Sequence, residues 1–458
     1  MAIKREDGAV QPGIKWWRFT TRIPGIHVDL NWPLIVQGGL MTMATAAAAA
    51  PLFMGFFGVS FEVGWALASL PLGWYWIQAF LFGLPYNPGW ITPALPLVLM
   101  HLGRYDVGVP TIQAMTALAL TVAFIMLFFA ITGLGEKFFS WIPIELRAGI
   151  ILGSAIAAFM GEFNRLETAG MPITMVIVWA VVFLLMFSIW ISDYKTKSRF
   201  VRQLATFAML IGFLVAGGVG PLVGEVTMQL QWGLFIPPFG EAIRSVSPFF
   251  VGWPTWDMFV TAFPLAILVY VVAFGDMILA NTLLADADHA RPDEKILTNT
   301  TTLHYSLFFR NLGQVLTFGP LIPMHGPIWT GVAVFIIEQY KEGRKQMESI
   351  FTGVINWYWL AFILVFLWPV VSFMRPILPV ALSITLILTG FACAYIAMRM
   401  VDTPTSRGYA LFIGLIIFKY GAAWGLGVGL LMFFLLLVQR KPIVAIPYDD
   451  ESDKVIKK

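Results

Sequence analysis

The sequence predicts an all-α polytopic membrane protein with about 14 transmembrane segments, built as an inverted repeat of roughly 7+7 segments whose two half-helices meet at the midplane. Three observations support this fold class: the composition, a pair of interrupted apolar segments, and the distribution of basic residues. Of the 458 residues, 59% are hydrophobic and 12% are charged, and the mean hydropathy is +0.79. This composition lies outside that of soluble globular proteins.

Two apolar segments, one in each half of the chain, are interrupted by proline and glycine. They read LPYNPGWITPALPLVLMHL (84–102) and LTFGPLIPMHGPIWTGVAVF (316–335), and each leaves too few apolar residues for a full span. Irregular backbone at membrane depth is tolerated only where protein or a water-filled cavity covers it. A pair of such segments at corresponding positions indicates the binding site of a transporter. The alternative is that proline and glycine only kink two ordinary spans.

About 14 apolar stretches have the length of a membrane span or of half a span. In chain order they are 34–58, 62–83, 91–102, 108–134, 142–160, 171–192, 203–223, 256–283, 299–317, 326–339, 350–373, 376–398, 406–420 and 421–439. The ninth is amphipathic because it contains His304, Arg310 and Asn311. Glycines at the junction near Gly421 leave open whether the last two stretches form one kinked element.

The basic residues alternate in a way that supports this count. They gather in the two tails and in the loops after the sixth and tenth segments. The clusters are Lys4, Arg5, Lys15, Arg18 and Arg22; Lys195, Lys197, Arg199 and Arg202; Lys341, Arg344 and Lys345; and Arg440, Lys441, Lys454, Lys457 and Lys458. By the positive-inside rule, both termini are cytoplasmic and the loop at 224–254 is external. We expect a protein of a bacterial inner (plasma) membrane, without a cleavable signal peptide because the first 30 or so residues are polar.

Segments seven positions apart resemble each other. The interrupted segments are the third and the tenth, and the stretches 142–160 and 376–398 both begin near an Ile-Pro or Leu-Pro and continue with small residues. Because seven is odd, the second repeat enters the membrane in the opposite orientation, which gives the inverted repeat.

At the level of single motifs, the chain resembles the nucleobase–ascorbate (xanthine/uracil) permeases, whose fold is shared with sulfate permeases and bicarbonate transporters. The stretch IVQGGLMTMATAAAAAP (35–51) is similar to the first helix of that family, with Gln37 near its start. The stretch VVAFGDMILANTLL (271–284) resembles the family's Glu-His-Ile-Gly-Asp followed by Ala-Asn. The matching positions are Gly275, Asp276, Ala280 and Asn281. The two signature glutamates of the family are replaced, because Val272 and Trp329 stand near their positions.

The resemblance implies a domain division and a mechanism. Segments 1–4 (34–134) and 8–11 (256–373) would form a core that carries the substrate. Segments 5–7 (142–223) and 12–14 (376–439) would form a gate that often dimerises, so we expect a homodimer. The tails at 1–33 and 440–458 would be cytoplasmic. The core would slide against the gate like an elevator.

The substrate site is predicted where the N-termini of the two half-helices face each other. Unpaired N–H groups and two positive dipole ends favour an anion or a carbonyl-rich solute there. The candidate substrate-binding residues are Gln37, Thr92, Pro93, Ala94, His325, Gly326, Trp329 and Thr330.

Asp276 is the candidate for coupling, since a carboxylate within a membrane span is costly and indicates function. It could carry a proton or ligate sodium. The alternative is a structural carboxylate that caps the tenth segment or pairs with Arg310 or His304. Arg310 is in turn either an anion-binding charge or a counter-ion within its own segment.

The predicted function is secondary active transport of a small polar or anionic solute, coupled to H⁺ or Na⁺, with a nucleobase-like solute or a small anion as substrate. The alternatives are an anion transporter or channel of the sulfate, bicarbonate or carboxylate type, and a membrane-embedded enzyme. We expect no enzyme activity, cofactor or metal site, because no nucleotide-binding loop, zinc spacing or Ser/His/Asp grouping is found. The net charge of +3 gives no argument for nucleic acid. The acidic residues at 286–294 are expected in a solvated loop.

Overall fold

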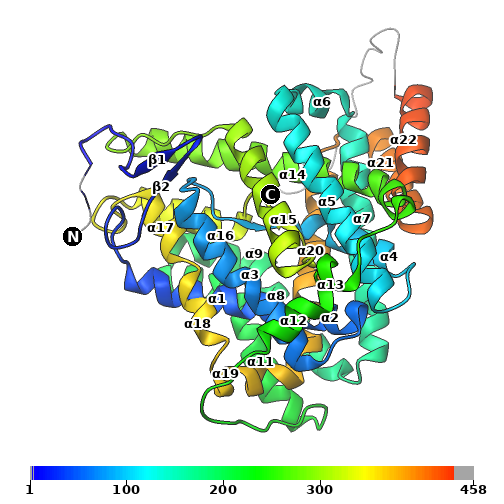
Figure 1. Ribbon diagram of the computed structural model, residues 1–458, viewed down its shortest axis with the longest axis horizontal. Helices are drawn as coiled ribbons and strands as arrows, with labels where there is room; N and C mark the ends of the chain where they lie inside the picture. The colour runs from blue at the N-terminus through cyan, green and yellow to red at the C-terminus, as the bar shows by residue number, and fades with distance from the viewer. Residues whose placement is uncertain (1–2, 4, 438–458) are drawn as a thin grey trace, which may run out of the picture.

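In the computed structural model, Ile3 and residues 5–437 are described, so the predicted C-terminal tail at 440–458 lies outside the described residues (Figure 1). Nearly all regular structure is helical. The first half contains α1 (Trp32–Ala47), α2 (Ala50–Phe57), α3 (Phe61–Leu81), η1 (Thr92–Ala94), α4 (Leu95–Leu102), α5 (Val109–Thr132), α6 (Gly135–Trp141), α7 (Ile144–Thr168), α8 (Pro172–Phe187), α9 (Ile189–Lys197), α10 (Arg199–Thr206) and α11 (Ala208–Leu222). The second half contains α12 (Phe239–Val246), α13 (Pro248–Val251), α14 (Trp256–Ala290), α15 (Thr300–Phe318), α16 (Thr330–Lys341), α17 (Ile350–Asn356), α18 (Trp359–Leu364), α19 (Trp368–Met374), η2 (Arg375–Ile377), α20 (Leu378–Arg399), α21 (Pro404–Tyr420) and α22 (Ala422–Leu436).

Among the described residues, five helical stretches are long and apolar enough to cross a membrane. They are Trp32–Phe57, Val109–Thr132, Ile144–Thr168, Trp256–Ala290 and Trp368–Arg399, and shorter apolar helices include Thr92–Leu102 and Ala422–Leu436. Each of the predicted segments contains at least one helix. The third and tenth segments are short, as their interrupted sequences predict.

The prediction of one span at 350–373 is wrong. The stretch contains three helices, α17, α18 and α19, and α18 ends at Leu364. Between α18 and α19, the carbonyl oxygen of Phe366 accepts a hydrogen bond from the N–H of Phe235, in the loop before α12, at 2.7 Å. α19 then leads through η2 into α20. The prediction also left open whether the last two segments are one element. They are two helices, because Gly421 has φ 92° and ψ 179°, a conformation that favours glycine.

The helices form two groups by packing. α5 packs along α14 and α15, and α1 packs along α18 and α3. α7 packs along α20 and α21, and α8 packs along α11. The first group comes from the segments predicted as the core and the second from those predicted as the gate. In Figure 1, α21 and α22 lie at the right edge, far from the hairpin of β1 (Ile14–Trp16) and β2 (Phe19–Thr21) at the upper left. The assignment of transport and gating roles to these groups stays a prediction.

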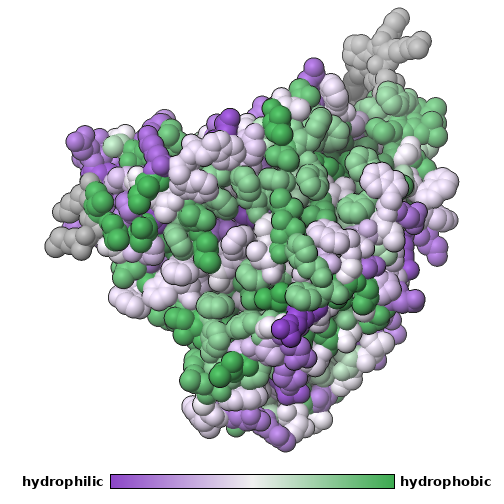
Figure 2. All heavy atoms as spheres, viewed as in Figure 1, coloured by the Kyte–Doolittle hydropathy of each residue, from purple (hydrophilic) through white to green (hydrophobic). Residues whose placement is uncertain are grey.

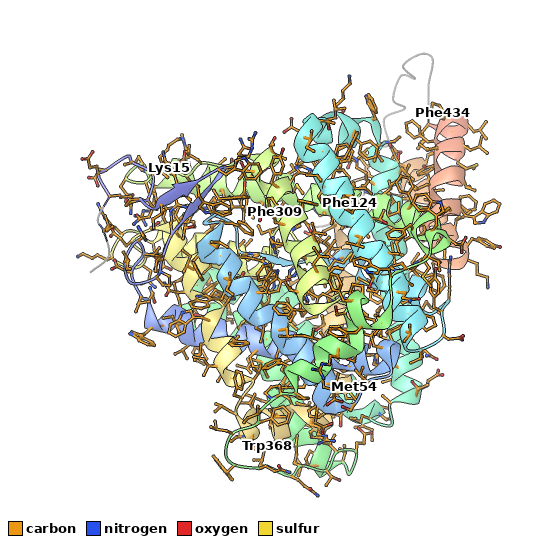
Figure 3. All side chains as sticks on the ribbon, viewed as in Figure 1. Lys15, Met54, Phe124, Phe309, Trp368 and Phe434 are labelled. Carbon is orange, nitrogen blue, oxygen red and sulfur yellow. The ribbon has the colours of Figure 1, made fainter. Side chains whose placement is uncertain are left out.

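Large apolar side chains cover much of the outer surface. Figure 2 shows hydrophobic residues across much of the visible face, among residues of intermediate hydropathy, with hydrophilic residues at its margins and in one group in the lower middle. Figure 3 labels three of the exposed aromatic residues, Phe124 on α5, Phe309 on α15 and Phe434 on α22. Exposed aromatic and aliphatic side chains on this scale are expected of helices that face lipid.

The N-terminal tail is ordered by buried charge pairs. The Arg5 side chain is fully buried, donates to Asp293 Oδ2 at 2.6 Å and to Glu348 O at 2.7 Å, and so joins the tail to the α14–α15 loop and to the α16–α17 loop. Arg291 donates to the same Asp293 carboxylate at 2.6 Å and 2.9 Å. The hydrogen bonds from Arg291, with the charge of Arg5, lower the pKa of Asp293.

The expectation of a solvated acidic loop at 286–294 is wrong in two respects: residues 286–290 continue α14, and of the last two acidic residues Asp293 is half-buried and Glu294 is buried. Glu294 is buried and accepts hydrogen bonds from Ser349 Oγ at 2.5 Å and from the N–H of Ile350 at 3.1 Å, at the start of α17. Sequence alone did not reveal this, because the partners of these acids lie on distant segments.

Substitution of Arg5 by glutamine should destabilise the detergent-solubilised protein by about 1–3 kcal/mol at pH 7. It removes one cation from a partly buried pair while Arg291 still compensates Asp293. Because the pKa of Asp293 is lowered in the folded state, the ionised carboxylate stabilises the fold at pH values above its pKa in the unfolded chain, roughly 4. This stabilisation is lost as the pH falls further. The difference between Arg5→Gln and the wild type should thus shrink below about pH 4 in thermal unfolding curves.

The matched control is Lys295→Gln. It removes an exposed ion pair with Asp288 at 2.6 Å and should cost under about 1 kcal/mol. Equal destabilisation by the two variants would contradict the role given to Arg5.

Candidate functional site

The two interrupted segments meet in the middle of the bundle. β3 (Gly89–Trp90) pairs antiparallel with β4 (His325–Gly326), and the N–H of Ile91 donates to Met324 O at 3.1 Å. β3 leads into η1 and α4, and β4 leads into α16. The two half-helices therefore begin beside each other, as the sequence predicts. An antiparallel pair with one strand from each half is the geometry that an inverted repeat produces.

Glycine is required at both strands because the backbones lie very close. A Cβ on Gly89 would lie 2.7 Å from the Trp329 nitrogen, and a Cβ on Gly326 would lie 2.7 Å from the carbonyl carbon of Trp90. Each obstacle is backbone that no rotamer change can move. The close approach therefore depends on these two residues.

A cavity of about 40 Å³ lies against this strand pair. It is lined by Thr42, Thr45 and Ala46 of α1, Leu72 and Tyr75 of α3, Pro88, Gly89, Trp90 and Thr92 of the first half-helix segment, and Trp329 and Tyr358. The hydroxyl of Tyr75 donates to Gly89 O at 3.1 Å, and that of Tyr358 donates to Pro88 O at 2.7 Å. No charged side chain lines the cavity among the described residues. Its walls are aromatic rings and threonine hydroxyls.

Two of the predicted substrate-binding residues, Thr92 and Trp329, line this cavity. Thr330 comes directly after Trp329 and is the first residue of α16, and Gly326 belongs to β4. Gln37 does not reach the cavity: it lies one to two turns before Thr42 on α1 and lines a separate groove beside α16. Thr42 and Thr45, which lie further along α1, line the cavity instead.

Part of the predicted backbone donors are already used. The N–H of Ala94 donates to Ile91 O at 3.1 Å, and Pro93, which has no N–H, accepts a hydrogen bond from Ser154 Oγ of α7 through its carbonyl oxygen. At the second half-helix, no side chain caps α16, and the N–H of Trp329 donates to Asn87 O at 2.8 Å. The start of α16 is thus the better source of free donors.

His325 is held behind the cavity as part of the scaffold. Its N–H donates to Asn311 Oδ1 at 3.0 Å, and its carbonyl accepts from Asn311 Nδ2 at 3.1 Å. Its ring lies edge-on to Tyr75, with the centroids 4.9 Å apart. His325 does not line the cavity and links β4 to α15, and its contact with substrate stays a prediction.

Arg310 of α15 is the charge next to the cavity. It is 2% exposed, its guanidinium lies 5.7 Å from the centre of the Tyr75 ring, and Tyr75 lines the cavity on its other side. Its Nε and Nη2 atoms have no hydrogen-bond partner among the described residues. No ion pair joins Arg310 to Asp276 in this part of the chain, so that structural alternative is not found. His304 is engaged elsewhere, with Tyr270 Oη at 3.2 Å and Thr300 O at 2.8 Å.

Asp276 lies midway along α14 and does not line the cavity. Among the described residues, neither Arg310 nor His304 pairs with it, and it lies within electrostatic range of Cys393 on α20. α14 packs on α5 of the first helix group and also contacts α7 and α22 of the second, so Asp276 lies on a helix at the boundary between the two groups.

The sequence missed most of the residues that shape the cavity. Tyr75, Trp90 and Tyr358 come from three separate segments, and nothing in their local spacing relates them. The one available signal was the placement of tyrosines within otherwise apolar spans, because a buried tyrosine hydroxyl needs an acceptor.

Comparison with known proteins identifies the fold. No protein-family model matches the chain, and no curated protein matches it in sequence. The structure of SLC26A9 matches with a TM-score of 0.52 and 14% identity, over 88% of this chain and 65% of that one. The chain shares its fold with SLC26A9. The transmembrane domain of the cyanobacterial bicarbonate transporter BicA matches with a TM-score of 0.48 and 11% identity, over 88% of this chain and 99% of that one.

The protein is therefore an all-α polytopic membrane protein, as the sequence predicts. Membership of the nucleobase–ascorbate permease family is not confirmed. The match spans just under two thirds of the SLC26A9 chain, and at this identity it shows the fold alone.

Replacement of Gly326 by alanine should disrupt the strand pair and lower stability by about 1–3 kcal/mol or more, because the new methyl group meets backbone atoms. Thermal unfolding of the purified variant measures the change. Gly331→Ala is the matched control, since a Cβ there meets nothing within 4 Å and alanine favours the helix. A Gly326→Ala protein as stable as Gly331→Ala would show that the close approach is not needed.

Proposed function

We propose that this protein is a secondary active transporter of a small anion, with the substrate held at the cavity beside β3 and β4. The observation that carries the proposal is the buried guanidinium of Arg310 next to the cavity, which among the described residues has no carboxylate partner and has two nitrogen atoms without a hydrogen bond. The sequence prediction of a nucleobase-like solute is replaced by its alternative, a sulfate-, bicarbonate- or carboxylate-type anion.

A buried charge without a partner costs several kcal/mol, so it is retained only where something compensates it. The residues around Arg310 supply aromatic rings, amides and hydroxyls but no ion-paired carboxylate in the described part of the chain. Gln78 lines a small cavity together with Arg310, and both atoms of its side-chain amide also lack a hydrogen-bond partner among the residues that the structure describes. A bound anion would compensate the charge, and this is the simplest reason for its position.

The start of α16 adds to the positive electrostatic potential that Arg310 produces at the cavity. This helix has 12 residues and no side-chain cap, and Trp329, its N-cap residue, lines the cavity. The positive end of a helix dipole and its free N–H groups stabilise an anion. The volume of about 40 Å³ and the walls of Tyr75 and Tyr358 favour a small solute.

As part of this proposal, the protein moves its substrate by an elevator-type movement and forms a homodimer, as the family resemblance implies. The site lies on the first helix group, while α7 and α20 of the second group contact η1. Sliding of the first group against these helices would carry the cavity across the membrane. Asp276, at the boundary of the groups, is proposed to couple this movement to H⁺ or Na⁺.

Arg310→Gln should reduce anion uptake into proteoliposomes at least tenfold, because the charge that compensates the substrate is removed. Its thermal stability without substrate should be equal to or higher than that of the wild type, since the variant also removes an unpaired buried charge. Stabilisation of the wild type by sulfate, bicarbonate or a short carboxylate should be lost.

Arg375→Gln is the control, because Arg375 is exposed and pairs with Glu62 at 3.3 Å. It should transport like the wild type. Full uptake by Arg310→Gln, or stabilisation of the wild type by nucleobases and by no anion, would refute the proposal.

Asp276→Asn should abolish uphill accumulation under a proton gradient while exchange and substrate binding persist, because the amide keeps the shape of the side chain and removes its titration. A purely structural Asp276 would instead give low folded yield with binding and accumulation lost together. Wild-type accumulation by the variant would exclude the proton-carrier role, and replacement of sodium by potassium then tests sodium coupling.

A further inference from the structure

A second cavity, of about 330 Å³, lies at the far end of α4 from the strand pair. Since α4 has eight residues, roughly 12 Å of helix separates the two places. The cavity opens between α4 and α14 of one helix group and the α21–α22 junction of the other. Its lining residues are Leu97, Met100, His101, Arg104, Val260, Thr261, Pro264, Leu265, Ile417, Tyr420, Gly421, Ala422, Ala423 and Trp424.

Three sources of positive charge or hydrogen-bond donors converge in this cavity. The guanidinium of Arg104 packs against Gly421, which is the N-cap residue of α22. No side chain of the described residues caps α22, a helix of 15 residues, and its first two residues line the cavity. His101 is 5% exposed and its Nε2 atom has no hydrogen-bond partner among the described residues.

This arrangement is unfavourable without a ligand. A cation near a helix N-terminus opposes the helix dipole, whereas an anion there is stabilised. Arg104 forms no ion pair within the described part of the chain, and no acidic residue lines the cavity. An anion between Arg104, His101 and the α22 N-terminus would turn each of these unfavourable features into a favourable contact.

The rest of the cavity is mostly apolar, although the hydroxyl-bearing residues Thr261 and Tyr420 also line it. Leu97, Val260, Pro264 and Leu265 form its wall along α4 and α14, and Trp424, which is largely exposed, stands at its edge on α22. Exposed tryptophans at helix ends are typical of the membrane interface. The cavity thus has an anion-binding end and an apolar side, which are the two properties of an anionic phospholipid.

We propose that this cavity binds an anionic phospholipid, with the phosphodiester at Arg104, His101 and the start of α22, and an acyl chain along α14. A lipid held there contacts both helix groups. The inference does not depend on the transported substrate, because the site shares no residue with the cavity at β3 and β4.

The test is titration of the full chain in detergent with phosphatidylglycerol, followed by native mass spectrometry, for the wild type and Arg104→Gln. Loss of one charge-assisted contact to the phosphate should weaken binding roughly tenfold. Arg244→Gln is the matched control, since Arg244 is also exposed but lies on α12 away from the cavity, and its affinity should equal that of the wild type. Ala422→Asp is a second variant, which places a carboxylate at the first position of α22 and should repel the phosphodiester while favouring the helix.

Three outcomes decide the proposal. Preference for phosphatidylglycerol over phosphatidylcholine, weakened in Arg104→Gln and Ala422→Asp but not in Arg244→Gln, supports it. Equal affinity in Arg104→Gln and Arg244→Gln overturns it. Binding that inorganic phosphate competes away, without preference between the two lipids, assigns the cavity to a free anion and overturns the lipid assignment.

Discussion

Two short strands carry main-chain groups into the middle of a helical bundle, where unpaired N–H and C=O groups are costly. β3 and β4 satisfy this constraint by pairing with each other across the two halves of the chain. The pairing is possible only because Gly89 and Gly326 let the backbones touch. It brings the starts of both half-helices to one place, and the cavity, the aromatic walls and the free donors of α16 all follow from it.

The structure treats two buried arginines in opposite ways. Arg5 is surrounded by Asp293, Glu348 and carbonyl oxygens, so its burial orders the N-terminal tail against the first helix group. Arg310 is also buried, but two of its nitrogen atoms have no hydrogen-bond partner in the described part of the chain. The same desolvation cost is thus compensated within the protein at one position and left uncompensated at the other. The contrast is the physical basis for assigning a structural role to the first and a binding role to the second.

Among the described residues, few polar contacts join the two helix groups near the site. One is the hydrogen bond from Ser154 Oγ of α7 to the carbonyl of Pro93, beside the first half-helix. Asp276 and the second cavity also lie where the groups meet. Groups that pack mainly by apolar contact can slide with little loss of hydrogen bonding, and this fits the proposed elevator movement.

Composition, the spacing of apolar segments and the paired interruptions determined the fold class and the meeting of 84–102 with 316–335. In a membrane, long apolar segments form helices, and irregular backbone within them is tolerated only where protein or a water-filled cavity covers it. The same patterns did not reveal the roles of Tyr75, Tyr358 or Arg104, since each acts through neighbours from distant segments. They also misplaced Gln37 at the site and Glu294 in solvent. Which side of a helix faces a cavity, and which acid meets which arginine, depends on the packing of several segments at once. Only the tertiary structure decides these contacts, because a sequence repeat defines the positions that can be buried and not the partners that they meet.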